Sequence, residues 1–126
     1  MSVRERLPFR LDVDAPVPAA ADVLRAVREA GGVVALAHPL AALRGRSVTR
    51  EEVEEMVDLG LQGIEVDHRD HDAAERELAA HWARAMNLVP LGSSDYHGEG
   101  KPHRLGENST AARSLTRICE QATSGV

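Results

Sequence analysis

The sequence has 126 residues, of which 43% are hydrophobic, and a formal net charge of −5 at pH 7. This length suits a single domain spanning 1–126 and is short for two ordinary ones. An acidic chain is a poor candidate for binding long duplex nucleic acid, because that binding depends on many lysine and arginine contacts to phosphates. The sequence contains no apolar run long enough to cross a bilayer and no visible signal peptide, so we expect a cytoplasmic protein.

The N-terminal part of the chain predicts an irregular lead-in followed by a helix and a strand. Residues 1–16 contain prolines and alternating charge. Residues 18–30 have the apolar spacing of a helix, with Leu24 on its inner side, and the following Gly31-Gly32 ends it. Residues 33–37 are apolar throughout, which is typical of a parallel strand buried on both faces.

A second helix and strand follow the loop over residues 40–48. Thr49 and Glu52 have the spacing of a capping box, which predicts a helix from there to about Leu59. The apolar stretch 63–66 predicts the next strand.

The C-terminal part predicts a helix, a strand and a helix. Residues 73–86 place Leu78, Trp82 and Met86 at four-residue intervals on one face. Residues 88–91 predict a strand, and Pro90, which has no backbone donor, favours either an edge position or a strand with one unused donor.

The last helix is predicted to run to about Gln121, with Ser109 or Thr110 as its N-cap. We expect its single cysteine, Cys119, to be a small buried apolar side chain. The predicted fold class is α/β, with alternating βα units around a short parallel sheet.

Histidine or aspartate follows every predicted strand. The side chains concerned are His38 after the first strand, Asp67, His68, Asp70, His71 and Asp72 after the second, and Ser93, Ser94, Asp95 and His97 after the third. Because ligand sites of parallel α/β folds form beyond the carboxyl ends of the strands, these groups are expected to converge. Imidazole and carboxylate donors together suit Zn, Mn or Fe.

Each of these pieces also has an ordinary structural interpretation. His38-Pro39 is compatible with a turn. The segment 67–72 is compatible with a solvated loop that caps the following helix. Lys101 and Arg104 are either surface cations or, since they follow the third strand closely, contacts for a substrate phosphate.

Three motifs in order carry a resemblance to a known family: Gly31–Pro39 ending in His38-Pro39, Gly60–Val66, and Gly92–Gly98 with the sequence Gly-Ser-Ser-Asp-Tyr-His-Gly. Together they resemble the PHP (polymerase and histidinol phosphatase) superfamily, most closely its small TrpH-like phosphoesterases. The resemblance covers about residues 18–123.

The resemblance implies a distorted (βα)7 barrel with two or three divalent metal ions at the strand ends, and hydrolysis of phosphate esters. It implies that His38, Asp95 and His97 are metal ligands and catalytic, with Lys101 or Arg104 binding substrate. Glu65, His68, His71 and Ser94 are candidates to support those ligands. The TrpH-like subgroup implies nucleoside 3′,5′-bisphosphates or short oligonucleotides as substrates.

The sequence departs from the family at one point, because it contains no His-x-His. We therefore expect it to correspond to the C-terminal part of a PHP domain, incomplete as an enzyme, which would self-associate or pair with an N-terminal PHP fragment. Two alternatives remain open: a non-catalytic, truncated or degenerate PHP fragment, and a polymerase-associated PHP module.

Overall fold

A computed structural model of the chain describes residues 19–100 and 104–123. Its elements are, in order, α2 (Ala20–Glu29), β1 (Ala35–Leu36), a 3-10 turn η1 (Ala42–Arg44), α3 (Arg50–Asp58), β2 (Gly63–Asp67), α4 (Ala73–Ala85), β3 (Val89–Gly92) and α5 (Ala112–Gln121). The strands form one parallel sheet in the order β1–β2–β3. The predicted fold class, alternating helices and strands around a short parallel sheet, is confirmed.

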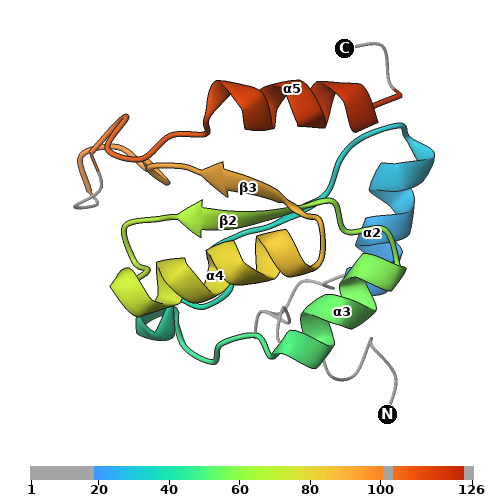
Figure 1. The fold of residues 1–126 in the computed structure, drawn as a ribbon. Helices are drawn as coiled ribbons and strands as arrows, with labels where there is room; N and C mark the ends of the chain where they lie inside the picture. Colours follow the sequence, from blue (N-terminus) through green and yellow to red (C-terminus); the bar gives the residue numbers. More distant parts are fainter. Residues whose placement is uncertain (1–18, 101–103, 124–126) are drawn as a thin grey trace.

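The sheet is covered by helices on both sides (Figure 1), with α5 on one side and α4 on the other. The core gathers around β2, where Ile64 is fully buried. Val53 and Met56 from α3 and Trp82 from α4 belong to the same apolar cluster. β2 lies at the centre of the sheet. Because the strands are parallel, their carboxyl ends all lie at the same end of the sheet.

Two of the helices begin at capping boxes that the sequence specifies. The Thr49 hydroxyl accepts a hydrogen bond from Glu52 N at 3.2 Å, and the Glu52 carboxylate accepts from Thr49 N at 3.1 Å. Asp72 and Glu75 form the same reciprocal pair at the start of α4, at 2.8 Å in each direction. The α3 cap is therefore confirmed, and the polar loop before α4 ends in a helix cap.

The predicted cap of the last helix is wrong. Its N-cap is Ala111, which makes no side-chain capping bond. The Thr110 hydroxyl instead accepts from Gly92 N at 3.1 Å and donates to Gly92 O at 2.8 Å. Thr110 thus joins the end of β3 to the segment before α5, a long-range contact that local sequence could not indicate.

The strand predicted over residues 33–37 is shorter and less covered than expected. β1 spans only two residues, and Ala35 and Ala37 are exposed while Leu36 is buried. The expectation of a strand buried on both faces is therefore wrong, and in the described part of the chain β1 pairs with β2 alone, which makes it an edge strand. Among the strands that the structure describes, β3 is the other edge, which is one of the two positions that Pro90 favoured.

Two helix side chains face outward against expectation. Leu78 is exposed although Trp82 is buried. Cys119 is exposed too, because α5 faces the sheet through Ser114, and a residue five positions later lies about 140° round a helix. The apolar pattern indicated an inner face without specifying which part of it would be covered.

Residues 1–16, predicted as an irregular lead-in, and Pro18, predicted in the first helix, lie outside the described residues. Within the described ranges, none of the helices has both the length and the apolar character needed to cross a bilayer.

We predict that Gly92→Ala destabilises the chain by about 1–3 kcal/mol, the usual cost of overpacking. A Cβ at this position would collide with the backbone carbonyl of Ser109 and lie 3.1 Å from Asp67 Cβ. Gly100→Ala is the matched control, because a Cβ there meets nothing within 4 Å. Urea unfolding of the three proteins measures the difference, and equal midpoints would contradict the prediction.

Candidate metal centre

The carboxyl ends of the three parallel strands bring together two imidazoles and a carboxylate. His38 follows β1, His68 follows β2 and Asp95 follows β3. One candidate ligand atom from each of these side chains lies within 4.8 Å of the other two. His68 is fully buried, and its ring centroid is 4.9 Å from that of His38. The predicted convergence at this edge of the sheet is therefore present for these three residues.

A single carboxylate on the central strand fixes the backbone on both sides of it. Glu65 accepts a hydrogen bond from His38 N at 2.9 Å through one oxygen, and from the Ser93 hydroxyl at 2.7 Å through the other. The first oxygen is also 3.9 Å from His68 Nε2. Glu65 thus ties the segments after β1 and β3 to β2, which sets the separation of the candidate ligands.

The backbone of two of these residues is in an unusual conformation. His38 has φ 26° and Asp95 has φ 51°, both in the left-handed region that side chains other than glycine seldom adopt. Such strain persists where surrounding contacts impose it, and it is concentrated at functional sites. Here the His38 N–H bond to Glu65 supplies one of those contacts.

The charges around Asp95 favour its ionised form. Burial alone would raise the pKa of Asp95, but the hydrogen bond from His68 and the positive charge of Arg44 hold it below its ordinary value. Burial lowers the pKa of His38, and the nearby Arg44 charge acts in the same direction. Near neutral pH the site therefore offers an anionic carboxylate and a neutral imidazole, the protonation states that metal ligation requires.

The hydrogen bonds of His68 and His97 assign them opposite tautomers. His68 Nδ1 accepts from Asp70 N at 2.9 Å, so its proton lies on Nε2, which donates to the Asp95 carboxylate at 3.1 Å. His97 Nδ1 donates to the Asp95 carbonyl, which places the lone pair on Nε2. A metal-bound histidine usually has the second arrangement. His97 is about half exposed and is not part of the three-residue group.

His71 and Ser94, which were predicted to support the ligands, are both buried. His71 Nδ1 donates to Val66 O at 2.9 Å, and its Nε2 accepts from Leu40 N at 3.2 Å. His71 is buried and uses both ring nitrogens to join the end of β2 to the loop after β1. Ser94 is buried beside Asp95 in the sequence.

The structure describes one of the two predicted phosphate contacts, Arg104. Arg104 is largely exposed and directed toward Glu107, with its Nε 3.9 Å from a carboxylate oxygen. Lys101, the other predicted substrate contact, lies outside the described residues.

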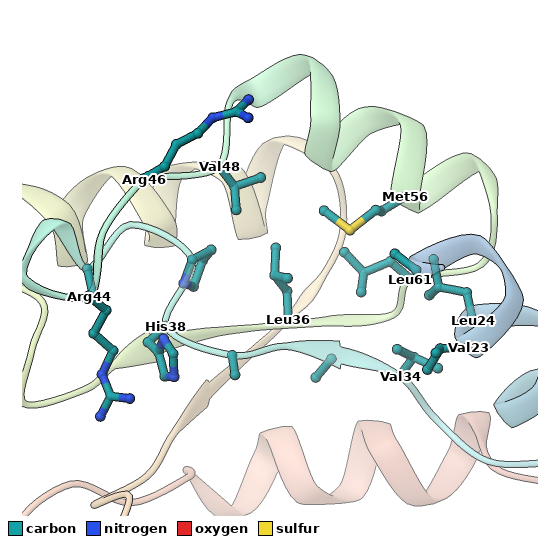
Figure 2. A pocket seen from close by; sticks show the side chains of 15 residues that line it. Val23, Leu24, Val34, Leu36, His38, Arg44, Arg46, Val48, Met56 and Leu61 are labelled. Atoms are coloured by element: carbon teal, nitrogen blue, oxygen red, sulfur yellow. The ribbon is translucent and has the colours of Figure 1, made fainter. Parts of the chain in front are cut away.

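Arg44 is the residue that sequence reasoning missed. Its Nε donates to Asp70 at 2.6 Å and its terminal nitrogen donates to Asp95 at 2.7 Å. It also lines a cavity of about 440 Å³ beside β1, together with His38 (Figure 2). In the sequence it is one of two arginines in the loop over residues 40–48, and its only signal was that this loop follows a strand and a histidine.

The donor set fits a divalent transition metal. Two imidazoles and an ionised carboxylate are ligands that Zn, Mn and Fe accept. His38 and Asp95 would hold such an ion with one further imidazole, either His68 or His97. Coordination through His68 Nε2 requires its proton to move to Nδ1, at the expense of the bond from Asp70 N.

Comparisons with known proteins indicate the same class of protein. The chain is 40% identical over 80 residues to phosphoribosyl 1,2-cyclic phosphate 1,2-diphosphodiesterase of Eggerthella lenta, a match that spans 64% of this chain and 29% of that protein. It superposes on a solved structure from Bifidobacterium adolescentis, described as a candidate metal-dependent phosphoesterase, with a TM-score of 0.83 and 37% identity. That superposition covers 88% of this chain and 39% of the other. A search of protein-family profiles finds no match.

Over the part that it matches, the chain thus has the fold of a structure described as a metal-dependent phosphoesterase. The resemblance to PHP-type enzymes drawn from the three motifs is confirmed over the part of those proteins that the chain matches. The chain spans less than a third of the length of the curated relative.

We predict that Glu65→Ala lowers the free energy of unfolding by about 1–3 kcal/mol, because the His38 amide and the Ser93 hydroxyl lose their acceptor. Glu77→Ala, at an exposed position on α4, is the control and should change it by less than about 0.5 kcal/mol. Chemical denaturation followed by circular dichroism measures both. Equal effects would show that Glu65 does not hold the strand ends.

Proposed function

We propose that this chain provides part of the active site of a metal-dependent phosphoesterase. The observation that carries the proposal is the meeting of His38, His68 and Asp95 at the ends of three parallel strands. The similarity of the chain to a phosphodiesterase and to a candidate phosphoesterase supports the same class of reaction.

The chemistry follows from the donors. A divalent ion bound here would lower the pKa of a coordinated water and polarise a phosphoryl oxygen. Asp95 contributes the negative charge that offsets part of the metal charge, and His38 contributes a neutral nitrogen. Glu65 keeps the His38 backbone in its left-handed conformation, so that the imidazole stays beside Asp95.

The third ligand is proposed to be His97, as the sequence motif implies, with His68 orienting Asp95 through its hydrogen bond. The tautomer of His97 supports this assignment, since its Nδ1 is bonded to a carbonyl oxygen. The proximity of His68 supports the alternative, in which His68 is itself a ligand. Substituting each histidine separately distinguishes the two roles.

The substrate is proposed to be a small phosphorylated ribose derivative. The Eggerthella relative is named for phosphoribosyl 1,2-cyclic phosphate. The TrpH-like motifs imply nucleoside 3′,5′-bisphosphates or short oligonucleotides. These substrates share a ribose that carries phosphate esters, and their small size suits a chain whose charge of −5 disfavours long nucleic acids.

The described donors are few for such an enzyme. Catalytic zinc sites use three protein ligands, and sites with two metals need more. We therefore expect residues 1–126 alone to bind metal weakly and to turn over substrate slowly. Self-association, pairing with an N-terminal PHP fragment and a cytoplasmic location stay predictions from the sequence.

We predict that Asp95→Asn and His38→Ala each weaken binding of Zn²⁺ or Mn²⁺ by at least about tenfold, since each removes a proposed ligand. His81→Ala, an exposed position on α4, is the control and should bind as the unsubstituted chain does. Isothermal titration calorimetry after chelator treatment measures the affinities. Unchanged affinity in both site variants would overturn the metal centre.

Activity is tested with the chain loaded with Mn²⁺ and assayed on adenosine 3′,5′-bisphosphate and on phosphoribosyl 1,2-cyclic phosphate. The expected result is slow, metal-dependent hydrolysis that Asp95→Asn abolishes, measured as phosphate release from the bisphosphate and as ring opening of the cyclic ester. Metal binding without any hydrolysis would favour the non-catalytic alternative. Hydrolysis that persists in Asp95→Asn would exclude this cluster as its site.

A further inference from the structure

The cavity beside β1 has an apolar wall that is partly open to solvent. Leu36 of β1, Leu24 of α2 and Met56 of α3 line it (Figure 2). Val23 and Ala35, also on the wall, are exposed. An engineered apolar cavity of about 150 Å³ holds a benzene ring. The present cavity, of about 440 Å³, therefore has room for several apolar side chains.

The strand beside this cavity lies at the edge of the sheet. Among the strands that the structure describes, β1 pairs with β2 alone. Ala35 and the adjoining Ala37 are small and exposed, and they leave the backbone of this segment accessible. An edge of this kind is a template for an extended peptide, which gains main-chain hydrogen bonds and places alternate side chains in neighbouring pockets. The cavity and the edge together suit an extended occupant that is apolar on one face.

The first part of the chain contains a segment with that pattern. In residues 7–13 every second side chain is apolar, and these side chains are Leu7, Phe9, Leu11 and Val13. Because successive side chains of an extended peptide point to opposite sides, the four would share one face. Pro8, which alternates with them, has no backbone donor and so suits the outside of a sheet edge.

The connection to α2 is short enough to hold this segment at the cavity. Ala20, the first residue of α2, lies on the cavity wall. Residue 13 precedes it by seven residues, so at about 3.3–3.6 Å per residue the segment ends within about 25 Å of the wall. A short tether of this kind gives a high effective concentration, which favours this segment over a separate partner.

The charge of the neighbouring helix favours the same occupant. α3 carries five acidic side chains and one arginine, whereas residues 1–10 carry three arginines and one glutamate. Glu52 is buried close to the cavity, since its Oε1 accepts a hydrogen bond at 3.1 Å from Arg46 on the cavity wall. Its Oε2 is buried and has no hydrogen-bond partner among the described residues. A guanidinium from the N-terminal segment would supply the missing donor.

We propose that residues 7–13 dock along β1, with the apolar side chains in the cavity and an arginine of residues 4–10 paired with Glu52. The segment then covers the strand that leads to His38 and the candidate metal centre. It also occupies the edge at which a second chain would pair, so it competes with the self-association expected from the sequence. This inference does not depend on the proposed catalytic function.

The experiment detects the segment at the cavity with a nitroxide spin label. The label is attached at residue 12 through Asp12→Cys, on the face opposite the apolar side chains. The exposed native cysteine is removed by Cys119→Ser, so that one site is labelled. Paramagnetic broadening of backbone amide resonances is recorded over residues 34–37 and over α5, which lies on the other side of β1 from the cavity (Figure 2).

We expect strong broadening at residues 34–37 and weak broadening at α5. Phe9→Asp should reduce the broadening at residues 34–37 by at least about half, because a charge is expelled from an apolar cavity. Ser2→Asp is the matched control, since it makes the same substitution of charge outside residues 7–13, and it should leave the broadening unchanged. Circular dichroism confirms that every variant is folded.

A mixed sample distinguishes this segment from that of a second copy. In the mixture the ¹⁵N-labelled chain carries no spin label, and an unlabelled copy carries it. Broadening of residues 34–37 in the mixture assigns the cavity to a second copy and overturns the proposal. Weak broadening in the singly labelled chain, or equal broadening in Phe9→Asp and Ser2→Asp, also overturns it, whatever the metal and activity measurements give.

Discussion

The arrangement of the site depends on the carboxylate of Glu65. This side chain projects from the central strand, β2, and its carboxylate accepts one hydrogen bond from the His38 amide and one from the Ser93 hydroxyl. On the β3 side the Ser93 amide also donates to Asp67 O at 3.1 Å, so this segment is held to β2 through the backbone as well. Because each oxygen of one rigid group binds a different segment, the distance between the segments is set by the group itself. His38 and Asp95 are thereby placed on either side of His68.

That arrangement concentrates negative charge, which has to be balanced. Asp95 remains ionised because His68 donates to it and because Arg44 lies beside it. A divalent cation would supply the same compensation with greater charge. The Asp95 carboxylate can therefore take part in a salt bridge, a hydrogen bond and a candidate metal site. Its negative charge also explains why Arg44 lies next to groups that attract cations.

Much of the fold was predictable because its determinants are local. The capping box at Thr49 and Glu52 needs only residues three apart, and it forms as predicted. The apolar stretch 63–66 forms a strand at almost the same bounds. The polar residues after each strand were expected at one edge of the sheet, because parallel strands align their carboxyl ends, and His38, His68 and Asp95 do meet there.

By itself, then, the sequence determined the order of elements, the parallel sheet and the residue types at its edge. The tertiary structure decided which of those residues touch. In it the Thr110 hydroxyl binds the end of β3 instead of capping α5, and Cys119 is exposed to solvent. It also brought Arg44 to Asp95 across 51 residues of sequence. Contacts of this range depend on how helices and loops pack over the sheet, and no pattern of neighbouring residues encodes that packing.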